Sequence, residues 1–463
     1  MTGDALDDRP GRTTAPVVEP DPSQDPLAGL LPATVQARSA ATVAACVDAA
    51  VSLLDDLGED GLTVEAVRAR SGVATGSIYH HFGDLSRLRA VARAVRSQRS
   101  IEVPVAAAVA RYGAADTAAA VARITREQVV GRDGAEARAT VWALTDAIAA
   151  ARDLPALRAV VAGVVRTGND RMAGVLAEHR DAGRLAPDVQ PRPTMLLSRA
   201  LAHVRLLDDL DPHPVPHRDW VAVACRIHDG LIGEDPLPPR PPSSARRRTD
   251  LAATIVTADL TDAADAGGDR RVTRLVARTR DLLVAGGPDL VQVARLRAEQ
   301  GLSAGWFHRA FGDRDGLLAA ARLDLLDRTL RAEVRSFEQL VAVARDPGEL
   351  VGAVADRFAA PAPDETVRRM RWQRADLLVA ARTSPALGYE AGRLITAATD
   401  DLAGTTAIAQ ARGLVRPDLA PRAVARVVQA MVFGLLLAEL DATPIARGAW
   451  VDTVRRGLLP LTA

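Results

Sequence analysis

The hydrophobic residues recur at helical spacing along most of the chain. In residues 42–57, Val43, Val47, Val51 and Leu54 lie three or four positions apart, so they share one face of a helix. Pro or Gly separates the later apolar stretches, which is typical of helix boundaries. No stretch stands out that alternates apolar and polar residues as a half-buried strand does. The pattern therefore predicts an all-α fold.

Two short helices are expected after this first one. Thr63 is a candidate N-cap for a helix over residues 64–70, and Ser71-Gly72-Val73 supplies a tight turn. A second short helix is expected over residues 75–81, followed by a longer one that begins at Leu85. Further helices are expected over residues 135–151, 156–181, 193–210 and 218–231.

The chain also repeats itself. Phe82-Gly83-Asp84 recurs as Phe311-Gly312-Asp313, at an offset of 229 residues (311 − 82 = 229). Further along, the offset becomes 230, which pairs Trp142 with Trp372 (372 − 142 = 230) and continues through several Pro and Gly positions. Because rare residue types carry these matches, chance similarity between Ala- and Arg-rich stretches is a poor explanation. The sequence predicts an internal duplication.

The duplication suggests six parts. In chain order they are a disordered, acidic and Pro-rich tail over residues 1–33, a helix-turn-helix domain over 34–100, a regulatory and dimerisation domain over 101–233, a linker over 234–269, a degenerate helix-turn-helix domain over 270–330 and a second regulatory and dimerisation domain over 331–463. An extended linker of about 35 residues reaches on the order of 100 Å. We therefore expect the two repeats to face each other as an intramolecular pseudo-dimer.

Two short helices joined by a Gly-containing turn predict a helix-turn-helix, although a plain helical hairpin has the same spacing. The residues spaced to form a small shared core are Val64, Val67, Val73, Ile78 and Phe82. The polar residues of the second helix then point outward. In that position the helix can enter the major groove, where each base pair presents its own pattern of donors and acceptors.

The stretch GLTVEAVRARSGVATGSIYHHFGD, residues 61–84, resembles the DNA-binding motif of the tetracycline-repressor (TetR/AcrR-like) family of transcriptional regulators. Gly72-Val73, Gly76 and residues 78–82 are the most specific part of the resemblance. Each repeat also has the length of one subunit of that family. The resemblance implies a three-helix DNA-binding domain, followed by ligand-sensing helices whose last two form a four-helix bundle with a second subunit.

Carried over by position, the resemblance assigns DNA contacts in both repeats. In the first repeat the candidates are Thr63, Thr75, Gly76, Ser77, Tyr79 and His80, together with Arg87 or Arg89 in place of the cation that family members often carry where this chain has Leu85. The second repeat has a weaker version, GLSAGWFHRAFGD, whose candidates are Ala304, Trp306, His308, Arg309 and Arg314. Because the two reading helices differ, we expect an asymmetric double-stranded DNA operator.

The charges add a second comparison between the repeats. The chain has 58 basic and 58 acidic residues, which argues against a protein that coats nucleic acid by bulk charge. Residues 61–100 carry seven Arg and two acidic residues, whereas residues 290–329 carry six Arg and five acidic residues. Attraction to phosphates supplies most non-specific affinity for DNA, so the first repeat is expected to dominate binding.

The resemblance also implies a small-molecule effector, whose binding would release a repressor from DNA. Candidate pocket residues are Trp142, Asp146, Arg166, Asn169 and His179 in the first repeat, and Trp372, Arg374, Asp376 and Tyr389 in the second. For the two Trp, packing in the core is an equally good interpretation, and for the charged residues a solvated helix face is the commoner one. The expected pairing surfaces are residues 193–210 and 218–231 against 423–440 and 446–459, with a further homodimer left open.

Other functional classes receive little support. No G-x-S-x-G, H-E-x-x-H, Walker or Rossmann motif is present, so an enzyme and a cofactor are not expected. A metal site is conceivable at His203, His213, His217, Cys225 and His228. Ordinary surface or core histidines are the better interpretation, because the spacing fits no known finger and the second repeat lacks these residues. The more serious alternative is an interaction protein that keeps the fold but has lost DNA binding.

The sequence also predicts a cytoplasmic protein. Two cysteines cannot make a disulfide framework, and the N-terminal residues lack the apolar core of a signal peptide. No apolar run is judged long enough to span a bilayer, the best candidate being residues 430–440.

Overall fold

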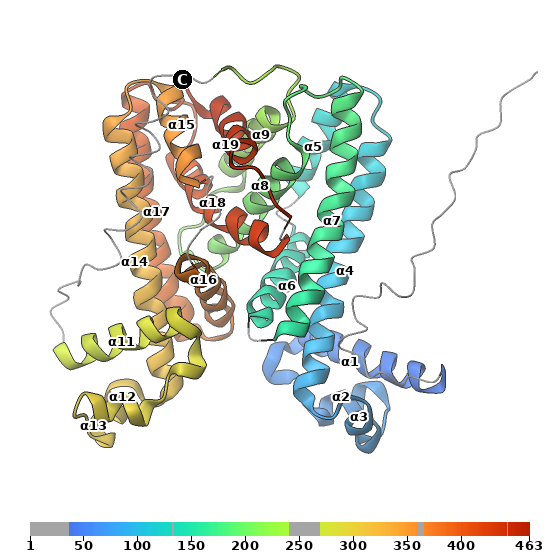
Figure 1. Cartoon of the computed structure of the whole chain (residues 1–463), viewed down its shortest axis with the longest axis vertical. Coiled ribbons are helices and arrows are strands. Elements are labelled where there is room, and N and C mark those ends of the chain that lie inside the picture. The colour runs from blue at the N-terminus through green and yellow to red at the C-terminus, as the bar shows by residue number, and fades with distance from the viewer. Residues whose placement is uncertain (1–36, 132–133, 153, 240–268, 359–364, 442) are drawn as a thin grey trace, which may run out of the picture.

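A computed structural model describes residues 37–131, 134–152, 154–239, 269–358, 365–441 and 443–463 (Figure 1). Every regular element within these ranges is a helix, so the described part of the chain is all-α, as the sequence predicted. The expected tail over residues 1–33 lies outside the described residues. Residues 240–268, which make up most of the expected linker, lie outside them too.

Residues 37–239, the first half, contain α1 (Ala37–Gly61), α2 (Val64–Ser71), α3 (Thr75–Phe82), α4 (Leu85–Gly113), α5 (Ala118–Gly131), α6 (Ala135–Ala151), α7 (Pro155–Asp181), α8 (Pro191–His203), the 3-10 helix η2 (Val204–Asp209) and α9 (His217–Leu231). Residues 269–463, the second half, contain α11 (Arg270–Gly286), η3 (Pro288–Leu290), α12 (Val293–Glu299), α13 (Ala304–Phe311), α14 (Arg314–Val343), α15 (Pro347–Phe358), α16 (Glu365–Thr383), α17 (Pro385–Ala411), α18 (Pro421–Asp441), α19 (Arg447–Leu458) and η4 (Leu459–Leu461).

The helix boundaries follow local signals in the sequence. The prediction for residues 135–151 coincides with α6, and those for the two short helices differ from α2 and α3 by one residue at the C-terminal end. Gly58 has a φ of 69° and interrupts α1 with non-helical backbone, although helical residues continue to Gly61. One expected helix is divided, because residues 193–210 contain the end of α8 and the tighter η2.

Two long helices form the outer part of each half. In the first half α4 packs along α7, and in the second half α14 packs along α17. Figure 1 shows these pairs on opposite sides of the molecule, with α8, α9, α18 and α19 between them. The short helices α2 and α3 lie at one end of this body, and α12 and α13 lie at the same end (Figure 1). The long helices α4 and α14 run from these units into the body.

Several pairs of helices join the two halves, and three of these contacts are the most extensive. The helix α8 packs against α18, and α9 packs against α19, on the surfaces expected from the sequence. A third contact, between α6 and α16, was not expected. At Gly230 in α9 a Cβ atom would clash with the carbonyl oxygen of Arg456 in α19. A larger residue therefore cannot replace this glycine without moving the two helices apart.

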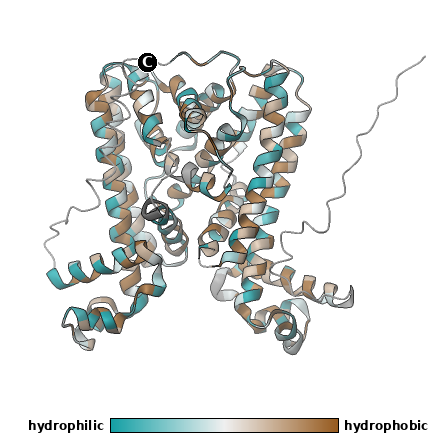
Figure 2. Cartoon of the chain, viewed as in Figure 1, coloured by the Kyte–Doolittle hydropathy of each residue, from teal (hydrophilic) through white to brown (hydrophobic). Residues whose placement is uncertain are grey.

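The buried apolar residues divide unequally between the two ends of the chain. One continuous core runs from the first unit, α1–α3, through both halves of the body. The second unit, α11–α13, has a separate core that includes Leu275, Leu296, Phe307 and Leu317. Figure 2 shows apolar and polar residues on different sides of the long helices, as expected for amphipathic helices that pack on a core.

One described helix is long and apolar enough to cross a membrane, which corrects the expectation that no such run exists. This helix is α18, and 86% of its most apolar stretch is buried inside the protein. The expectation considered only residues 430–440, whereas the helix begins at Pro421. Its burial is that of a core helix, and the core helix of a globular protein passes the same test of length and composition.

The first residues of the expected linker are held against the body. The backbone N–H of Leu237 donates to the Asp188 carboxylate at 2.8 Å, and Arg456 donates to the carbonyl of Asp235 at 3.0 Å. Residues 234–239 therefore extend the first half rather than starting a free connection.

Candidate nucleic-acid interface

Backbone and side-chain contacts fix the turn between α2 and α3. The Thr63 hydroxyl accepts a hydrogen bond from the N–H of Ala66 at 3.1 Å, so Thr63 is the N-cap of α2. Gly72 closes the helix with a φ of 70°, and its N–H donates to the carbonyl of Arg68 at 3.0 Å. Only glycine adopts this left-handed conformation readily, so Gly72 permits the sharp turn.

The short helix α3 has one buried and one exposed face. Ile78 and Phe82 are each 1% exposed, and with Val67 they form the shared core that the sequence predicted. Val64 and Val73 are half-buried against it. The polar face consists of Thr75, Gly76, Tyr79 and His80, which are exposed, and Ser77, which is half-buried. Tyr79 keeps 49% of its surface exposed. Side chains on this face are therefore accessible to a partner.

The two arginines proposed as phosphate contacts differ in position. Arg87 is exposed in the first turn of α4, where Asp84 caps the helix by accepting from the Arg87 N–H at 2.8 Å. Arg89 is half-buried and donates to the carbonyl of Leu62 at 3.3 Å, so it braces the start of α2. Of the two, Arg87 is better placed to reach a phosphate.

The Arg-rich flank of the first unit is largely paired with acidic residues that the sequence window omitted. Arg70 pairs with Asp56 at 2.6 Å, Arg96 with Asp55 at 2.7 Å and Arg99 with Asp48 at 2.6 Å, and all three carboxylates belong to α1. The local excess of positive charge is therefore smaller than residues 61–100 alone suggested.

The second unit repeats the same turn geometry with other side chains. Gly301 and Gly312 have φ values of 64° and 73°, matching Gly72 and Gly83 of the first unit. The Ser303 hydroxyl accepts from the N–H of Trp306 at 3.2 Å and caps α13. The exposed residues of α13 include Ala304, His308 and Arg309.

Three of the candidates in this unit are engaged within it. Trp306 is half-buried, packs edge-on against Phe311 and has the guanidinium of Arg271 5.3 Å from its ring centroid. Arg314 donates to the carbonyls of Val291 at 3.2 Å and Pro288 at 2.7 Å. His308 bonds through Nδ1 to the carbonyl of Gly312 at 2.5 Å but keeps an exposed surface, so His308 and Arg309 are the exposed polar candidates on α13.

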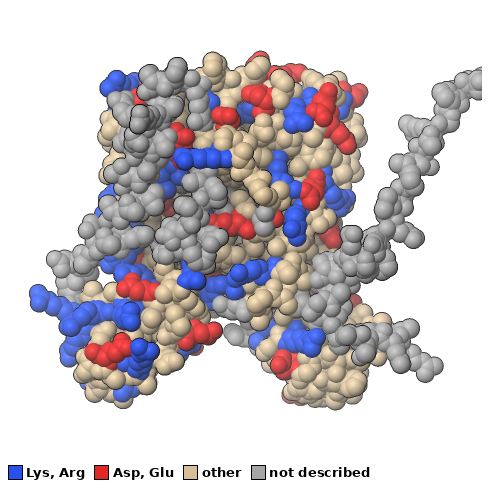
Figure 3. Space-filling model, viewed as in Figure 1, with Lys and Arg blue, Asp and Glu red and all other residues tan. Residues whose placement is uncertain are grey.

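Basic residues of the second unit gather on its first helix instead. Arg270, Arg274 and Arg278 are exposed and lie four residues apart, so they form a stripe along α11. Figure 3 shows basic side chains gathered around the second unit at the lower left. The sequence comparison missed this stripe because its window began at residue 290. The helical spacing of these arginines was the signal that could have found it.

The first unit presents a helix-turn-helix at one end of a helical body, and the second unit repeats its turn geometry at the same end. The sequence profile described as "Bacterial regulatory proteins, tetR family" matches residues 47–86, within the first unit. Residues 47–86 are therefore similar to the helix-turn-helix domain of the TetR family, and this similarity indicates a DNA-binding transcriptional regulator. No curated protein matches the chain.

A cleft between the halves contains two of the predicted effector contacts. It has a volume of about 730 Å³ and lies between α6 and η2 of the first half and α16 and α17 of the second. Trp142 and Tyr389 line it, together with Arg138, Asp209 and Arg382, which the sequence analysis did not select. The indole N–H of Trp142 donates to Asp209 at 2.7 Å, and the guanidinium of Arg382 lies 5.0 Å from the Trp142 ring centroid.

The other predicted pocket residues lie elsewhere, and most are engaged with neighbouring side chains. Asp146 pairs with Arg96 at 3.4 Å, and Asp376 pairs with Arg152. Trp372 has the guanidinium of Arg158 5.3 Å from its ring centroid. The remaining four are Arg166, which is exposed, Asn169, which donates to Asp441, His179, which bonds to the Tyr112 carbonyl, and Arg374, which pairs with Glu333.

The conceivable metal cluster does not assemble in the described residues, among which no group of three or more His, Cys, Asp or Glu could hold an ion. His228 bonds to the Ser198 hydroxyl at 2.9 Å and to the Ala224 carbonyl at 2.7 Å. His203 bonds to the Arg199 carbonyl at 2.9 Å. These helical histidines serve the packing of the body.

Proposed function

We propose that this protein is a transcriptional repressor whose two halves act together as an intramolecular pseudo-dimer on an asymmetric DNA operator. The main support for this proposal is that two helix-turn-helix units, with α3 and α13 exposed, lie at the same end of one body (Figure 1). A homodimer reads a palindrome because its two recognition helices are identical. Here the accessible residues differ, with Tyr79 and His80 on α3 and His308 and Arg309 on α13.

The arrangement of charge supports different roles for the two units in DNA binding. In the first unit α3 offers a tyrosine and a histidine to base edges and phosphates, with Arg87 beside them. In the second unit the stripe of Arg270, Arg274 and Arg278 offers charge to the backbone. Phosphate contacts position a protein on the duplex, whereas contacts to base edges specify the sequence. The first unit would then supply most of the specificity, and the second would supply salt-dependent affinity.

The test begins with the full chain and a pool of random duplex DNA. Selection of bound fragments should yield a non-palindromic site, and the complex should contain one chain per site. Tyr79→Ala should weaken binding to that site about tenfold or more. Ile408→Ala, which removes another exposed large side chain (58% exposed) from α17, is the matched control and should bind like the wild type. A perfect palindrome bound by two chains would contradict the pseudo-dimer.

The second unit is tested through salt dependence. Each phosphate contact contributes about 0.9 to the slope of log affinity against log salt concentration. The double substitution Arg274→Ala with Arg278→Ala should lower that slope by about 1–2 while leaving the selected sequence unchanged. An unchanged slope would show that α11 does not approach the DNA. If the full chain selects no DNA sequence above background, the alternative of an interaction protein without DNA binding is favoured.

The effector would bind in the cleft between the halves. A ligand there contacts α6 and α16, so it can change how the halves sit, and it must bind the released state more tightly than the DNA-bound state. The indole of Trp142, the exposed ring of Tyr389 and the guanidinium of Arg382 suit a planar aromatic acid. A panel of small aromatic acids should include one that weakens DNA binding by the wild type and not by Arg382→Ala. Equal release of both proteins would place the effector elsewhere.

A further inference from the structure

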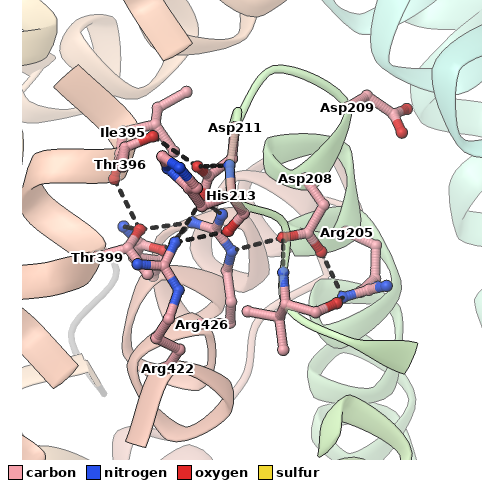
Figure 4. Close-up of polar contacts among 12 residues, drawn as sticks. Arg205, Asp208, Asp209, Asp211, His213, Ile395, Thr396, Thr399, Arg422 and Arg426 are labelled. Carbon is pink, nitrogen blue, oxygen red and sulfur yellow. Dashed lines mark hydrogen bonds and ion pairs between the residues drawn. The ribbon is translucent and has the colours of Figure 1, made fainter. Parts of the chain in front are cut away.

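A buried cluster of charges joins the two halves where α18 meets η2 and the residues that follow it. Its centre is Arg426 of α18, whose side chain is 0% exposed. It donates to Asp208 of η2 at 3.0 Å and to Asp211, and both carboxylates belong to the first half (Figure 4). Within its own half it donates to Thr399 at 2.8 Å and Gln429 at 2.7 Å. A fully buried guanidinium is costly unless it is paired in this way.

Part of the cluster occurs twice, once on each side of the contact between the halves. Arg422 of the second half donates to Asp211 of the first at 3.0 Å. The residues at the 230-residue offset, Arg192 and Asp441, form the same pair at 2.6 Å. Each of these arginines also pairs with an aspartate of its own half, Arg422 with Asp400 and Arg192 with Asp170. These pairs would be satisfied whichever two halves came together.

The centre of the cluster occurs only once. The residue 230 positions before Arg426 is Leu196, and the residue 230 positions after Asp208 is Ala438. Leu196 is 0% exposed. One side of the contact therefore has a buried arginine opposite an aspartate, and the other has a leucine and an alanine at the equivalent positions.

We propose that the Arg426–Asp208 pair selects the association of a first half with a second half and disfavours every association of like halves. The proposal rests on the proposed pairing of the halves and is independent of DNA binding. Between two first halves, Leu196 would replace Arg426, so Asp208 and Asp211 would lose their shared donor and retain only Arg205 and Arg192 as cations. Between two second halves, Arg426 would face Ala438 and lose one of its two carboxylates.

Such selection acts through repulsion of wrong partners as much as attraction of the right one. Removing one member of a buried charge pair leaves a desolvated charge that water cannot reach. Specificity requires only that this penalty fall on the competing associations. The symmetric pairs Arg422–Asp211 and Arg192–Asp441 strengthen all associations equally, so they cannot discriminate. Discrimination therefore depends on Arg426 and Asp208.

The experiment that tests this proposal measures which halves associate when the cleaved chain is unfolded and refolded. A protease site is placed within residues 240–268, and the folded full chain is cleaved. One preparation carries an affinity tag on its first half, and the other carries isotope label in its second half. The two are mixed, unfolded together in denaturant, refolded and captured through the tag. In the wild type, the captured complex should contain labelled second halves, which shows exchange, and no untagged first halves.

The double variant Arg426→Leu with Asp208→Ala makes the two sides of the contact alike. With discrimination removed and equal amounts mixed, untagged first halves should occupy about a quarter of the captured partner positions, as random pairing requires. Arg422→Leu is the matched control, because it weakens the contact without changing which halves associate. Strictly mixed pairing in the double variant, or untagged first halves captured with the wild type, would overturn the proposal.

A second measurement uses the uncleaved chain, so it remains informative if the cleaved halves fail to refold. Arg426→Leu should lower the denaturant midpoint of unfolding, because it strands Asp208 and Asp211. Adding Asp208→Ala to it should restore part of that loss, although Asp208→Ala alone also lowers the midpoint. Additive losses would contradict a coupled pair. Because none of these readouts involves DNA, a failure of the proposed operator binding would leave them unchanged.

Discussion

The two helix-turn-helix units share their helix order and turn glycines but are attached to the body in different ways. The core of the first unit is continuous with that of the body. Arg96 of α4 joins Asp55 of α1 to Asp146 of α6, so one side chain ties the unit to the body. The second unit encloses its own core. It contacts the body through α16, where the Gln373 side chain donates to the carbonyl of Leu283 in α11 at 3.3 Å.

The side chains on α3 and α13 also differ between the two units. On α3 the large exposed aromatic side chain is Tyr79, with 49% of its surface accessible. On α13 the residue 229 positions after Tyr79 is the exposed His308, and the half-buried Trp306 packs between Arg271 and Phe311. The first unit thus exposes a tyrosine where the second has a histidine, and the second unit uses its tryptophan for packing.

The largest expected effect tests the difference between the cores. Phe82 is 1% exposed in the continuous core, whereas Phe311, its counterpart, is half-buried. Phe82→Ala should destabilise the first unit by about 3–5 kcal/mol, and Phe311→Ala should destabilise the second by about 1–2 kcal/mol. Amide hydrogen exchange of α1–α3 and α11–α13 measures both. For Phe82→Ala, faster exchange should extend into the body. If it stays within α1–α3, the two cores are not connected in the way described.

The helices and the helix-turn-helix of the first unit could be predicted from the sequence because their signals are local. Thr63, Gly72 and Pro155 mark helix ends by their own backbone preferences, and the spacing of Val67, Ile78 and Phe82 predicted their burial. Residues whose role depends on distant partners were not predictable in this way. No local rule places the guanidinium of Arg314 on the carbonyls of Val291 and Pro288, or α6 against α16.

The comparison of charges between the two units also failed to account for contacts with distant residues. Counting residues 61–100 gave an excess of arginine, but the carboxylates that pair with several of them lie in α1. The singular position of Arg426 was visible in the 230-residue alignment as an arginine opposite Leu196. Its importance became apparent only when the structure placed it beside Asp208 and Asp211.

A smaller effect concerns how the long helices are joined in each half. In the first half the buried His179 of α7 bonds through Nε2 to the Tyr112 carbonyl at 2.9 Å, and its Nδ1 accepts from Arg184 at 2.7 Å. In the second half the equivalent position is Ala409. Burial lowers the pKa of His179 below its ordinary value of 6.5, and the charge of Arg184 acts in the same direction. The folded protein therefore favours the neutral ring.

The sign of the pH dependence follows from this shift. Below pH 6.5 the unfolded chain takes up a proton that the folded chain resists, so the contribution of His179 to stability is present above pH 6.5 and is lost as the pH falls below it. Between the folded and unfolded pKa values each pH unit changes stability by about 1.4 kcal/mol. Thermal unfolding at pH 7.5 and 5.5 should show a fall in midpoint that is smaller in His179→Gln. An identical fall in both proteins would exclude His179 as its source.

The smallest expected effect comes from the helix N-caps, which differ between the two units. In the first unit Thr63 caps α2 and the N-cap of α3, Ala74, makes no side-chain bond. In the second unit Ser303 caps α13 and Gln292 makes no side-chain bond at the start of α12. Thr63→Ala and Ser303→Ala should each cost about 1 kcal/mol, and Ala74→Ser, at a residue with extended backbone, should add a few tenths to about 1 kcal/mol. Hydrogen exchange should place the first loss in α2, the second loss in α13 and the gain in α3. If Ser303→Ala also accelerated exchange in α1–α3, the second unit could not be the independent body that its separate core indicates.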